Sequence, residues 1–237
     1  MEQISKMYHL SGKRTIGLLL LYFVGYSLIL PGLLVTLTLS INPDAQMISI
    51  PFSVVGYLLT IALTVWIAKP LLKDSFKQFT NHLLRNILII IIGFFAILFV
   101  NLLLGVIISF FTDSAESVNQ QTIAENAAIA PMFTLFASTV FAPIVEECVF
   151  RGGVFTNLRK KHSFLFAMMI SSLLFGFIHV LDSVLSGNYS DLIFLLIYTG
   201  LGFVLSYSYE KTNSIYVSMA IHLGNNLIAF FAMMSTM

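Results

Sequence analysis

The amino-acid sequence predicts an all-α, polytopic membrane helix bundle with about seven transmembrane helices. Three observations lead to this fold class: an apolar composition, seven long stretches almost free of charge, and a one-sided distribution of Lys and Arg. Of the 237 residues, 58% are hydrophobic and only 10% are charged, and the mean hydropathy is +0.93. Soluble domains contain about 45–50% apolar and about 25% charged residues. This chain therefore has too few polar side chains to cover a water-facing surface.

The seven apolar stretches are each long enough to cross a bilayer, whose hydrocarbon core of about 30 Å requires roughly 20 residues of helix. They cover residues 15–39, 48–68, 86–111, 131–158, 163–181, 192–209 and 213–235. The first is longer than the apolar core of a secretory signal peptide, so we expect a retained signal anchor. The fourth is the only one that contains charged residues.

The Lys and Arg residues predict the orientation of the helices. They flank alternate ends of the stretches: Lys6, Lys13 and Arg14; Lys69, Lys73, Lys77 and Arg85; Arg159, Lys160 and Lys161; Lys211. The opposite loops, 40–47, 112–130 and 182–191, contain acidic residues but no Lys or Arg. Because cytoplasmic loops collect basic residues, we expect a cytoplasmic N-terminus and a C-terminus outside.

The chain is predicted to form one integral membrane domain. Residues 1–125 would form a three-helix region with an outer loop, and residues 126–237 a four-helix core. Within 112–130, the four-residue spacing of Ile123, Ala127 and Pro131 suggests an interfacial helix.

Two classes of function are excluded by composition. The net charge of +1, without a basic stripe, provides no site for nucleic-acid phosphates. The single cysteine, Cys148, excludes an internal disulfide and a cysteine-based zinc or redox cluster, and we expect it to be a buried, inert thiol. Trp66, Tyr22 and Tyr57 are too scattered to define a cofactor site.

Three charged residues lie inside the fourth stretch: Glu146, Glu147 and Arg151. An intramembrane charge costs at least about 2.5–3.5 kcal/mol and persists mainly when it is paired or functional. One interpretation places Arg151 at the membrane edge. If the helix instead runs on to Arg159, Glu146 lies about 20 Å deep at 1.5 Å per residue.

The second interpretation is favoured because two histidines then reach a similar depth. His179 would lie about 24 Å deep and His222 about 16 Å deep. Taken singly, His179 near Asp182 could be an interfacial residue, and His222 with Asn226 could be an interhelical hydrogen-bonding pair.

Helical spacing predicts which of these side chains share a face. Glu147 and Arg151 are four residues apart, so we expect an ion pair that leaves Glu146 unneutralised. His222 and Asn226 have the same spacing, as do Phe175 and His179. We expect Pro143, Gly152 and Gly153 to bend the fourth helix or to let a neighbour approach. A carboxylate, two histidines and an amide can activate water and stabilise an oxyanion, or they can bind a divalent metal.

At these positions the sequence resembles the CPBP family of intramembrane proteases, also called Abi or type II CAAX prenyl protease-like proteins. The three motifs EExxxR, FxxxH and HxxxN occur in the expected order on three helices, as Glu146–Arg151, Phe175–His179 and His222–Asn226. The resemblance covers about residues 130–230, and the first three helices carry none of it.

The resemblance implies a role for each motif residue. Glu146 and His179 would activate the attacking water, His222 and Asn226 would hold the tetrahedral oxyanion, and Glu147 and Arg151 would organise the site. It leaves open whether a metal takes part; a metal-free glutamic mechanism is favoured, with a divalent metal such as zinc as the alternative.

The predicted function is therefore an intramembrane endopeptidase in a bacterial plasma membrane, where a prenylated CAAX substrate is not expected. Its substrate would be a membrane-associated peptide or protein, in peptide maturation, bacteriocin immunity or signalling. One alternative is a non-catalytic regulatory or immunity protein that binds a sensor kinase or a secreted-peptide precursor. A third, a proton-coupled transporter, is disfavoured because the sequence has no matching halves with interrupted helices.

Overall fold

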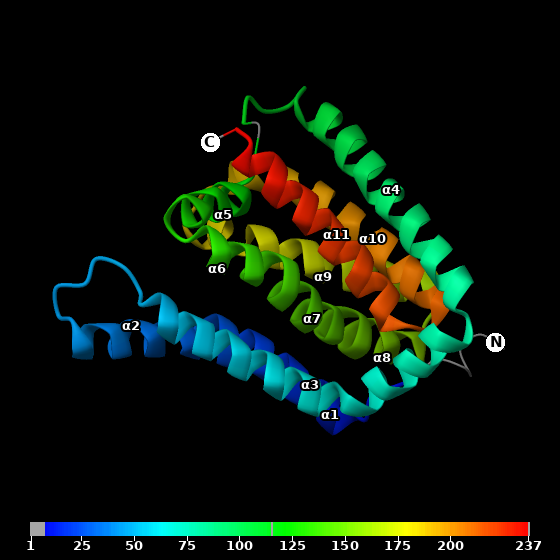
Figure 1. Cartoon of the computed structure of the whole chain (residues 1–237). Helices are drawn as coiled ribbons and strands as arrows, with labels where there is room; N and C mark the ends of the chain where they lie inside the picture. The colour runs from blue at the N-terminus through cyan, green and yellow to red at the C-terminus, as the bar shows by residue number, and fades with distance from the viewer. Residues whose placement is uncertain (1–7, 115, 237) are drawn as a thin grey trace.

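The structure is a computed structural model, and it describes residues 8–114 and 116–236. Within this part of the chain all regular structure is helical (Figure 1), and seven helices are long and apolar enough to cross a membrane. The predicted fold class is therefore confirmed. Lys6, used above for topology, lies outside the described residues.

Several of the seven spans consist of helical segments joined end to end. In chain order they are α1–η2–α2 (Gly12–Leu20, Leu21–Ile29, Leu30–Ile41), α3 (Ile50–Asn81), α4 (Leu83–Ile108), α6–η3–α7–η4–α8 (Pro131–Phe136, Ala137–Phe141, Ala142–Glu147, Cys148–Phe155, Thr156–Arg159), α9 (Phe164–Leu185), η5–α10 (Tyr189–Phe194, Leu195–Thr212) and α11 (Ile215–Met234). A further helix, α5 (Val118–Ile129), lies between the third and fourth spans.

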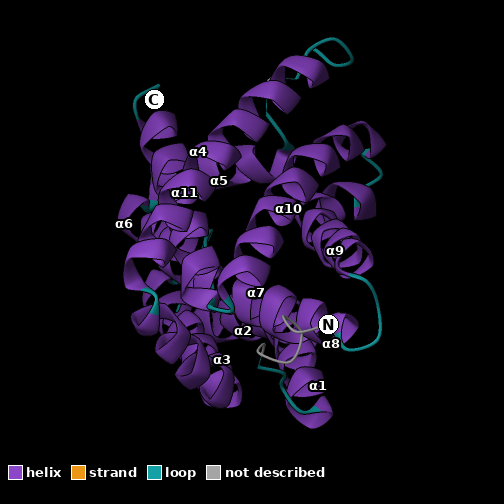
Figure 2. Cartoon of the chain, turned by 90° about the vertical axis from the view of Figure 1, so that its right-hand side faces the viewer, coloured by secondary structure: helices purple, strands orange, loops and turns teal. Residues whose placement is uncertain are grey.

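The fourth span lies at the centre of the protein. Half of the residues in its most apolar window are buried, compared with 11% in the third span. Its segments contact α1, α3, α9, α10 and α11, and Figure 2 shows α7 among these helices in a second view. The residues of the fourth span therefore face protein on most sides, whereas those of α4 mostly face lipid.

The α9–α10 pair packs closely because small residues alternate across it. A Cβ atom at Gly202 would lie 2.8 Å from the Ser172 Cα atom, and one at Gly176 would lie 3.0 Å from the Thr199 backbone nitrogen. Close approach through small residues is the usual way in which membrane helices pack.

The first two spans form a hairpin, and its α2–α3 end lies apart from α5 and α6 in Figure 1. Large apolar side chains on α2, such as Leu33 and Leu39, are exposed, as expected for a surface that faces lipid. The opposite half of the hairpin, α1 and the middle of α3, contacts the fourth span.

The predicted end of the second span is wrong. The sequence analysis ends this span at residue 68 and places a loop before the third span. The structure instead continues α3 to Asn81, and only His82 separates it from α4.

The extension of α3 is an amphipathic helix. Leu71 and Ser75 are buried one turn apart, while the charged positions with the same spacing are exposed: Lys69, Lys73 and Lys77. An amphipathic helix continues where mean hydropathy falls, because one face is still buried. Pro70 lies inside the helix, where its missing backbone donor removes one helical hydrogen bond.

The predicted helix within 112–130 is confirmed as α5, and it is docked on the bundle. Ala127 is buried against Phe230 and Met233 of α11. The Asp191 carboxylate accepts hydrogen bonds from the Val118 backbone nitrogen at 3.0 Å and from the Ser183 hydroxyl at 2.6 Å. Asp191 therefore ties the start of α5 to the neighbouring spans.

Apart from Arg151, which lies in the interior, the described Lys and Arg residues lie toward one end of the bundle. There, Lys160 Nζ donates to the Leu10 carbonyl at 3.2 Å, and the Arg14 guanidinium donates to backbone carbonyls of α3. Both α3 and the α10–α11 turn reach the same end, where the Ser214 hydroxyl donates to the Ser75 carbonyl at 2.9 Å. The arrangement agrees with the predicted one-sided topology, while the orientation across the membrane stays a prediction.

Candidate active site

The fourth span brings the EExxxR residues into the protein interior. It runs without interruption from Pro131 to Arg159, and Arg151 is fully buried. The helix therefore continues past Arg151 to Arg159, as the interpretation that places Glu146 deep in the membrane requires. The span contains wider, π-helical turns, one of which (η4) begins directly after Glu147; such turns are frequent at functional sites.

Of the two glycines in this span that could admit a neighbour, the structure identifies Gly152. A Cβ atom there would collide with the Leu71 side chain of α3, whereas one at Gly153 would make only ordinary contacts. Gly152 therefore lets α3 approach the segment that carries the charges.

Glu147 and Arg151 form the predicted ion pair. Arg151 Nη1 donates to Glu147 Oε1 at 2.9 Å, and both side chains are fully buried. Arg151 Nη2 also donates to the Gly202 carbonyl of α10 at 3.2 Å, and the guanidinium carbon lies 4.5 Å from the centre of the Phe175 ring. Each of these contacts compensates a charge that has lost its water.

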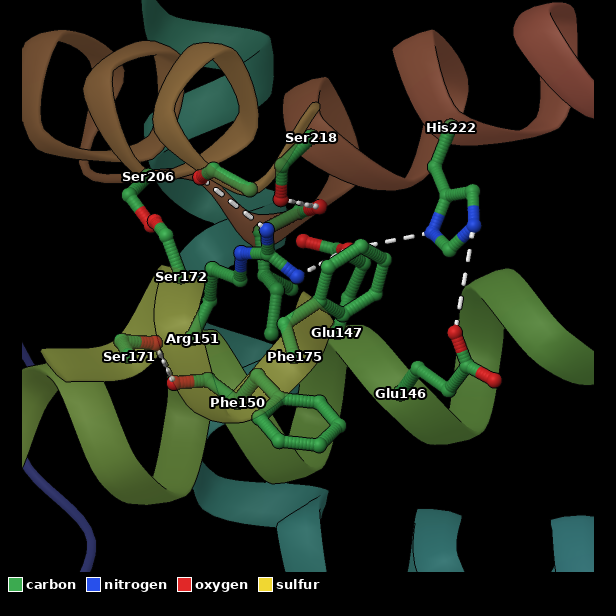
Figure 3. Close-up of polar contacts among 12 residues, drawn as sticks. Glu146, Glu147, Phe150, Arg151, Ser171, Ser172, Phe175, Ser206, Ser218 and His222 are labelled. Carbon is green, nitrogen blue, oxygen red and sulfur yellow. Dashed lines mark hydrogen bonds and ion pairs between the residues drawn. The ribbon is translucent and has the colours of Figure 1, made fainter. Parts of the chain in front are cut away.

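His222 lies between the two glutamates (Figure 3). Its Nδ1 atom is 3.1 Å from Glu147 Oε1, and its Nε2 atom is 3.9 Å from Glu146 Oε2. Because an ionised carboxylate can only accept, Nδ1 carries a proton. Glu147 therefore orients the imidazole so that Nε2 faces Glu146, much as the aspartate orients the histidine of a catalytic triad.

Glu146 has a different environment from its neighbour. Its side chain is nearly buried, with 9% of the residue exposed. Oε1 accepts a hydrogen bond from the Tyr22 hydroxyl at 3.4 Å, while Oε2 is buried without a hydrogen-bond partner. A buried carboxylate oxygen with no partner calls for an explanation, and an acceptor of this kind is what a general base provides.

His179 lies on α9, where the Phe175 ring contacts both His179, with centroids 4.8 Å apart, and His222, with centroids 5.7 Å apart. The His179 Nδ1 atom is 2.8 Å from the Phe175 carbonyl, which can only accept. Nδ1 is therefore the protonated nitrogen, and Nε2 of the neutral ring is left as an acceptor. The ring stacks on Tyr198, with centroids 4.4 Å apart and planes inclined by 22°.

Asn226 ends a chain of amide hydrogen bonds. Asn101 of α4 donates to Asn225 at 3.0 Å, and Asn225 donates to Asn226 Oδ1 at 3.1 Å. Asn226 Nδ2 donates to the Ser138 carbonyl at 2.8 Å. This direction of donation leaves the second Nδ2 hydrogen of Asn226 for another acceptor.

Several of these partners are not predicted by the sequence patterns. Asn101 had a usable signal, because it is the only side chain between Asn86 and Ser109 that can donate a hydrogen bond, in an otherwise apolar span. No sequence pattern indicates the Tyr22 contact, because hydropathy does not show which face of the first helix turns toward Glu146. The sequence patterns also do not predict a buried ion pair in which the Arg159 guanidinium donates to both Glu210 oxygens, at 3.1 and 2.7 Å.

Among the residues that the structure describes, no three His, Cys, Asp or Glu side chains are grouped so that they could hold an ion, whereas zinc sites use at least three protein ligands. Cys148 is fully buried, as expected.

Comparison with known proteins gives an independent result. Residues 128–228, which contain all three motifs, match the family model for type II CAAX prenyl endopeptidase Rce1-like proteins. No solved structure matches the chain at a significant level.

Three bacterial relatives also match. The chain is 31% identical over 177 residues to the "Putative membrane peptidase YdiL" of Bacillus subtilis, covering 74% of this chain and 68% of that protein. It is 30% identical over 174 residues to protein YvdC of Lactococcus lactis, covering 72% and 61% of the two chains. It is 25% identical over 153 residues to the "Membrane-embedded CAAX protease MroQ" of Staphylococcus aureus, covering 61% and 58%.

The family match includes the helices that bring Glu146, His179 and His222 together, and the first of these relatives is matched over more than two thirds of both chains. The chain therefore belongs to the Rce1-like, type II CAAX prenyl endopeptidase family of multi-pass membrane proteins, the family that its motifs resemble.

Proposed function

We propose that the protein is an intramembrane endopeptidase in which Glu146 activates water to hydrolyse a peptide bond. The observation that carries this proposal is the contrast between the two adjacent glutamates. Each glutamate has one buried oxygen without a hydrogen-bond partner. Glu147 is paired with Arg151 at 2.9 Å, whereas Glu146 Oε2 faces only His222 Nε2, at 3.9 Å. The family membership supports a peptidase, and the geometry supports Glu146 as its base.

The reaction would begin with a water molecule at Glu146 Oε2. This oxygen takes a proton from the water, and the resulting hydroxide adds to the carbonyl carbon of the scissile peptide bond. His179 Nε2, the unprotonated nitrogen of that ring, accepts the remaining hydrogen of the water and orients it. General-base catalysis of this kind contributes about 10²- to 10⁴-fold in rate.

The tetrahedral oxyanion would then accept hydrogen bonds from His222 Nε2 and from the free Nδ2 hydrogen of Asn226. His222 can donate from both nitrogens only as an imidazolium, and the Glu147 carboxylate compensates this charge while Glu146 holds the proton taken from water. The intermediate breaks down when the carbon–nitrogen bond cleaves and Glu146 returns its proton to the leaving amine. No step of this mechanism requires a metal.

The substrate we propose is a membrane-associated peptide or protein cleaved near its membrane boundary. The site lies between membrane-spanning helices, so a soluble folded protein cannot present a backbone segment there. The bacterial relatives support a location in a bacterial plasma membrane, and peptide maturation, bacteriocin immunity and signalling are the corresponding roles.

The test compares peptides in membranes that contain the wild-type protein, Glu146→Gln or Glu125→Gln. Glu125 is an exposed carboxylate on α5, so its variant controls for the loss of a charge. We expect new peptide termini with the wild-type protein and Glu125→Gln, and none with Glu146→Gln, when mass spectrometry compares the three. Identical termini in all three membranes would contradict the proposal.

Two further measurements separate the remaining alternatives. Stoichiometric zinc that is lost together with activity on chelation would contradict the metal-free mechanism. If Glu146→Gln restores the phenotype of a deletion strain as fully as the wild-type protein, a non-catalytic role, such as binding a sensor kinase or a peptide precursor, would replace the peptidase proposal.

A further inference from the structure

Tyr22 connects the first helix to the proposed catalytic base. Its hydroxyl lies 3.4 Å from Glu146 Oε1, and this is the hydrogen bond that the structure records for that carboxylate. The distance is long for an O–H···O bond, but bonds in a catalytic site often shorten only when substrate is present. Tyr22 lies far outside the family-matched residues 128–228.

The Tyr22 ring is held firmly in this position. Its residue is only 5% exposed. The ring stacks on Tyr26, with centroids 5.7 Å apart, and meets Phe150 edge-on at 5.9 Å. Phe150 belongs to the same helix as Glu146, so the hydroxyl and the carboxylate are fixed relative to each other by the same packing.

The two oxygens of Glu146 are therefore not equivalent. Oε1 already accepts from Tyr22, whereas Oε2 has no hydrogen-bond partner and faces His222. A proton that arrives at the carboxylate goes most readily to the oxygen that is not already accepting a hydrogen bond.

We propose that Tyr22 is a positioning residue that holds Glu146 Oε1 and so makes Oε2 the oxygen that takes the proton from water. The inference rests on the proposed function of Glu146, and it assigns a part of the site to the first helix. Tyr22 touches neither water nor peptide in this scheme and acts through Glu146 alone.

The chain provides a matched control one helical turn away. Tyr26 is packed in the same aromatic cluster, but its hydroxyl donates to the Tyr57 hydroxyl at 3.3 Å instead of to Glu146. Tyr22→Phe and Tyr26→Phe each remove one buried hydroxyl from the same helix, and only the first removes a donor to Glu146.

The first arm of the test does not depend on peptidase activity. Dicyclohexylcarbodiimide reacts with protonated carboxyl groups in apolar surroundings, and fragment-ion mass spectrometry distinguishes labelling of Glu146 from labelling of Glu147. Because a hydrogen bond to a carboxylate favours its ionised form, Tyr22→Phe should label at Glu146 about 5-fold faster than the wild-type protein. Tyr26→Phe should label at the wild-type rate.

The second arm uses a synthetic peptide that spans the cleavage site mapped by the membrane comparison. Tyr22→Phe should lower kcat about 10-fold with KM unchanged, because it misdirects the base without altering peptide binding. Tyr26→Phe should keep both values. Thermal unfolding midpoints should be the same for the two variants.

Equal labelling of Glu146 in all three proteins would overturn the inference, whether or not the protein cleaves a peptide. Equal losses of kcat in the two tyrosine variants, or a rise in KM alone, would show that the cluster only packs the helix. Failure of the peptidase proposal is recognised separately, as an absence of cleavage by the wild-type protein.

Discussion

At the scale of single residues, the site depends on two adjacent glutamates that have different partners. Glu147 contacts Arg151 and His222 through Oε1, whereas Glu146 contacts the Tyr22 hydroxyl through its own Oε1. The same ion pair that keeps Arg151 inside the membrane therefore also orients His222 toward Glu146. In the proposed mechanism, structural and catalytic roles are divided between neighbouring side chains that contact different partners.

The Arg151–Glu147 pair predicts a strong and asymmetric effect of mutation. Arg151→Met leaves Glu147 as an uncompensated buried charge, and it should lower the free energy of unfolding by about 3–5 kcal/mol. Adding Glu147→Gln removes that charge and should restore at least half of the loss. Unfolding titrations in mixed micelles measure both values. A double variant as unstable as Arg151→Met alone would show that the charge imbalance is not the cause.

At the scale of helices, the close packing of α9 on α10 places a backbone carbonyl of α10 beside the Arg151–Glu147 ion pair. Gly202 lets the backbone of α10 approach Ser172 and also presents the carbonyl that accepts from Arg151. The close approach requires that no side chain stand at this position.

Gly202→Ala should therefore destabilise the protein by about 1–3 kcal/mol, since its Cβ atom would meet the backbone of Ser172, which cannot rotate away. Gly105→Ala on α4 is the control, because a Cβ atom there meets nothing within 4 Å; it should be neutral or stabilise the helix by up to about 1 kcal/mol. Denaturation of both variants under the same conditions checks the difference. Equal effects would mean that loss of glycine itself, and not the close approach, determines the stability.

The helices also show which structural features hydropathy predicts and which it does not. Hydropathy located all seven spans, because crossing a bilayer imposes a length and an apolar composition on each helix separately. It ended the second span too early, because past Pro70 the helix is stabilised by one buried face, to which Leu71 and Ser75 belong, and average hydropathy does not detect a face.

In the site, likewise, contacts within one helix could be predicted from the sequence and contacts between helices could not. Helical spacing was sufficient for the Glu147–Arg151 pair, because both residues belong to one helix. The contacts of Glu146 with Tyr22 and of Asn225 with Asn101 join residues that are 124 positions apart in each case. Such contacts depend on how each helix is rotated about its axis, which is determined by packing between helices.

At the scale of the whole molecule, the gathering of Lys and Arg at one end predicts which loops face the cytoplasm. Cys148 is fully buried, so the wild-type protein should not react with a membrane-impermeant maleimide. Gln46→Cys, in the α2–α3 loop, should be labelled in intact cells, while Lys161→Cys, in the α8–α9 turn, should be labelled only in inverted vesicles. Both positions are exposed in the structure. The reverse labelling pattern would show that the protein has the opposite orientation in the membrane.

The central claim is that Glu146 activates a water molecule inside the membrane domain. The most direct measurement is cleavage of the mapped peptide by purified protein in ¹⁸O-labelled water, with mass spectrometry of the new C-terminus. The account predicts one ¹⁸O atom in the new carboxylate, a rate about 10²- to 10⁴-fold lower for Glu146→Gln, and an unchanged rate for Glu125→Gln. Cleavage by Glu146→Gln at the wild-type rate would contradict it.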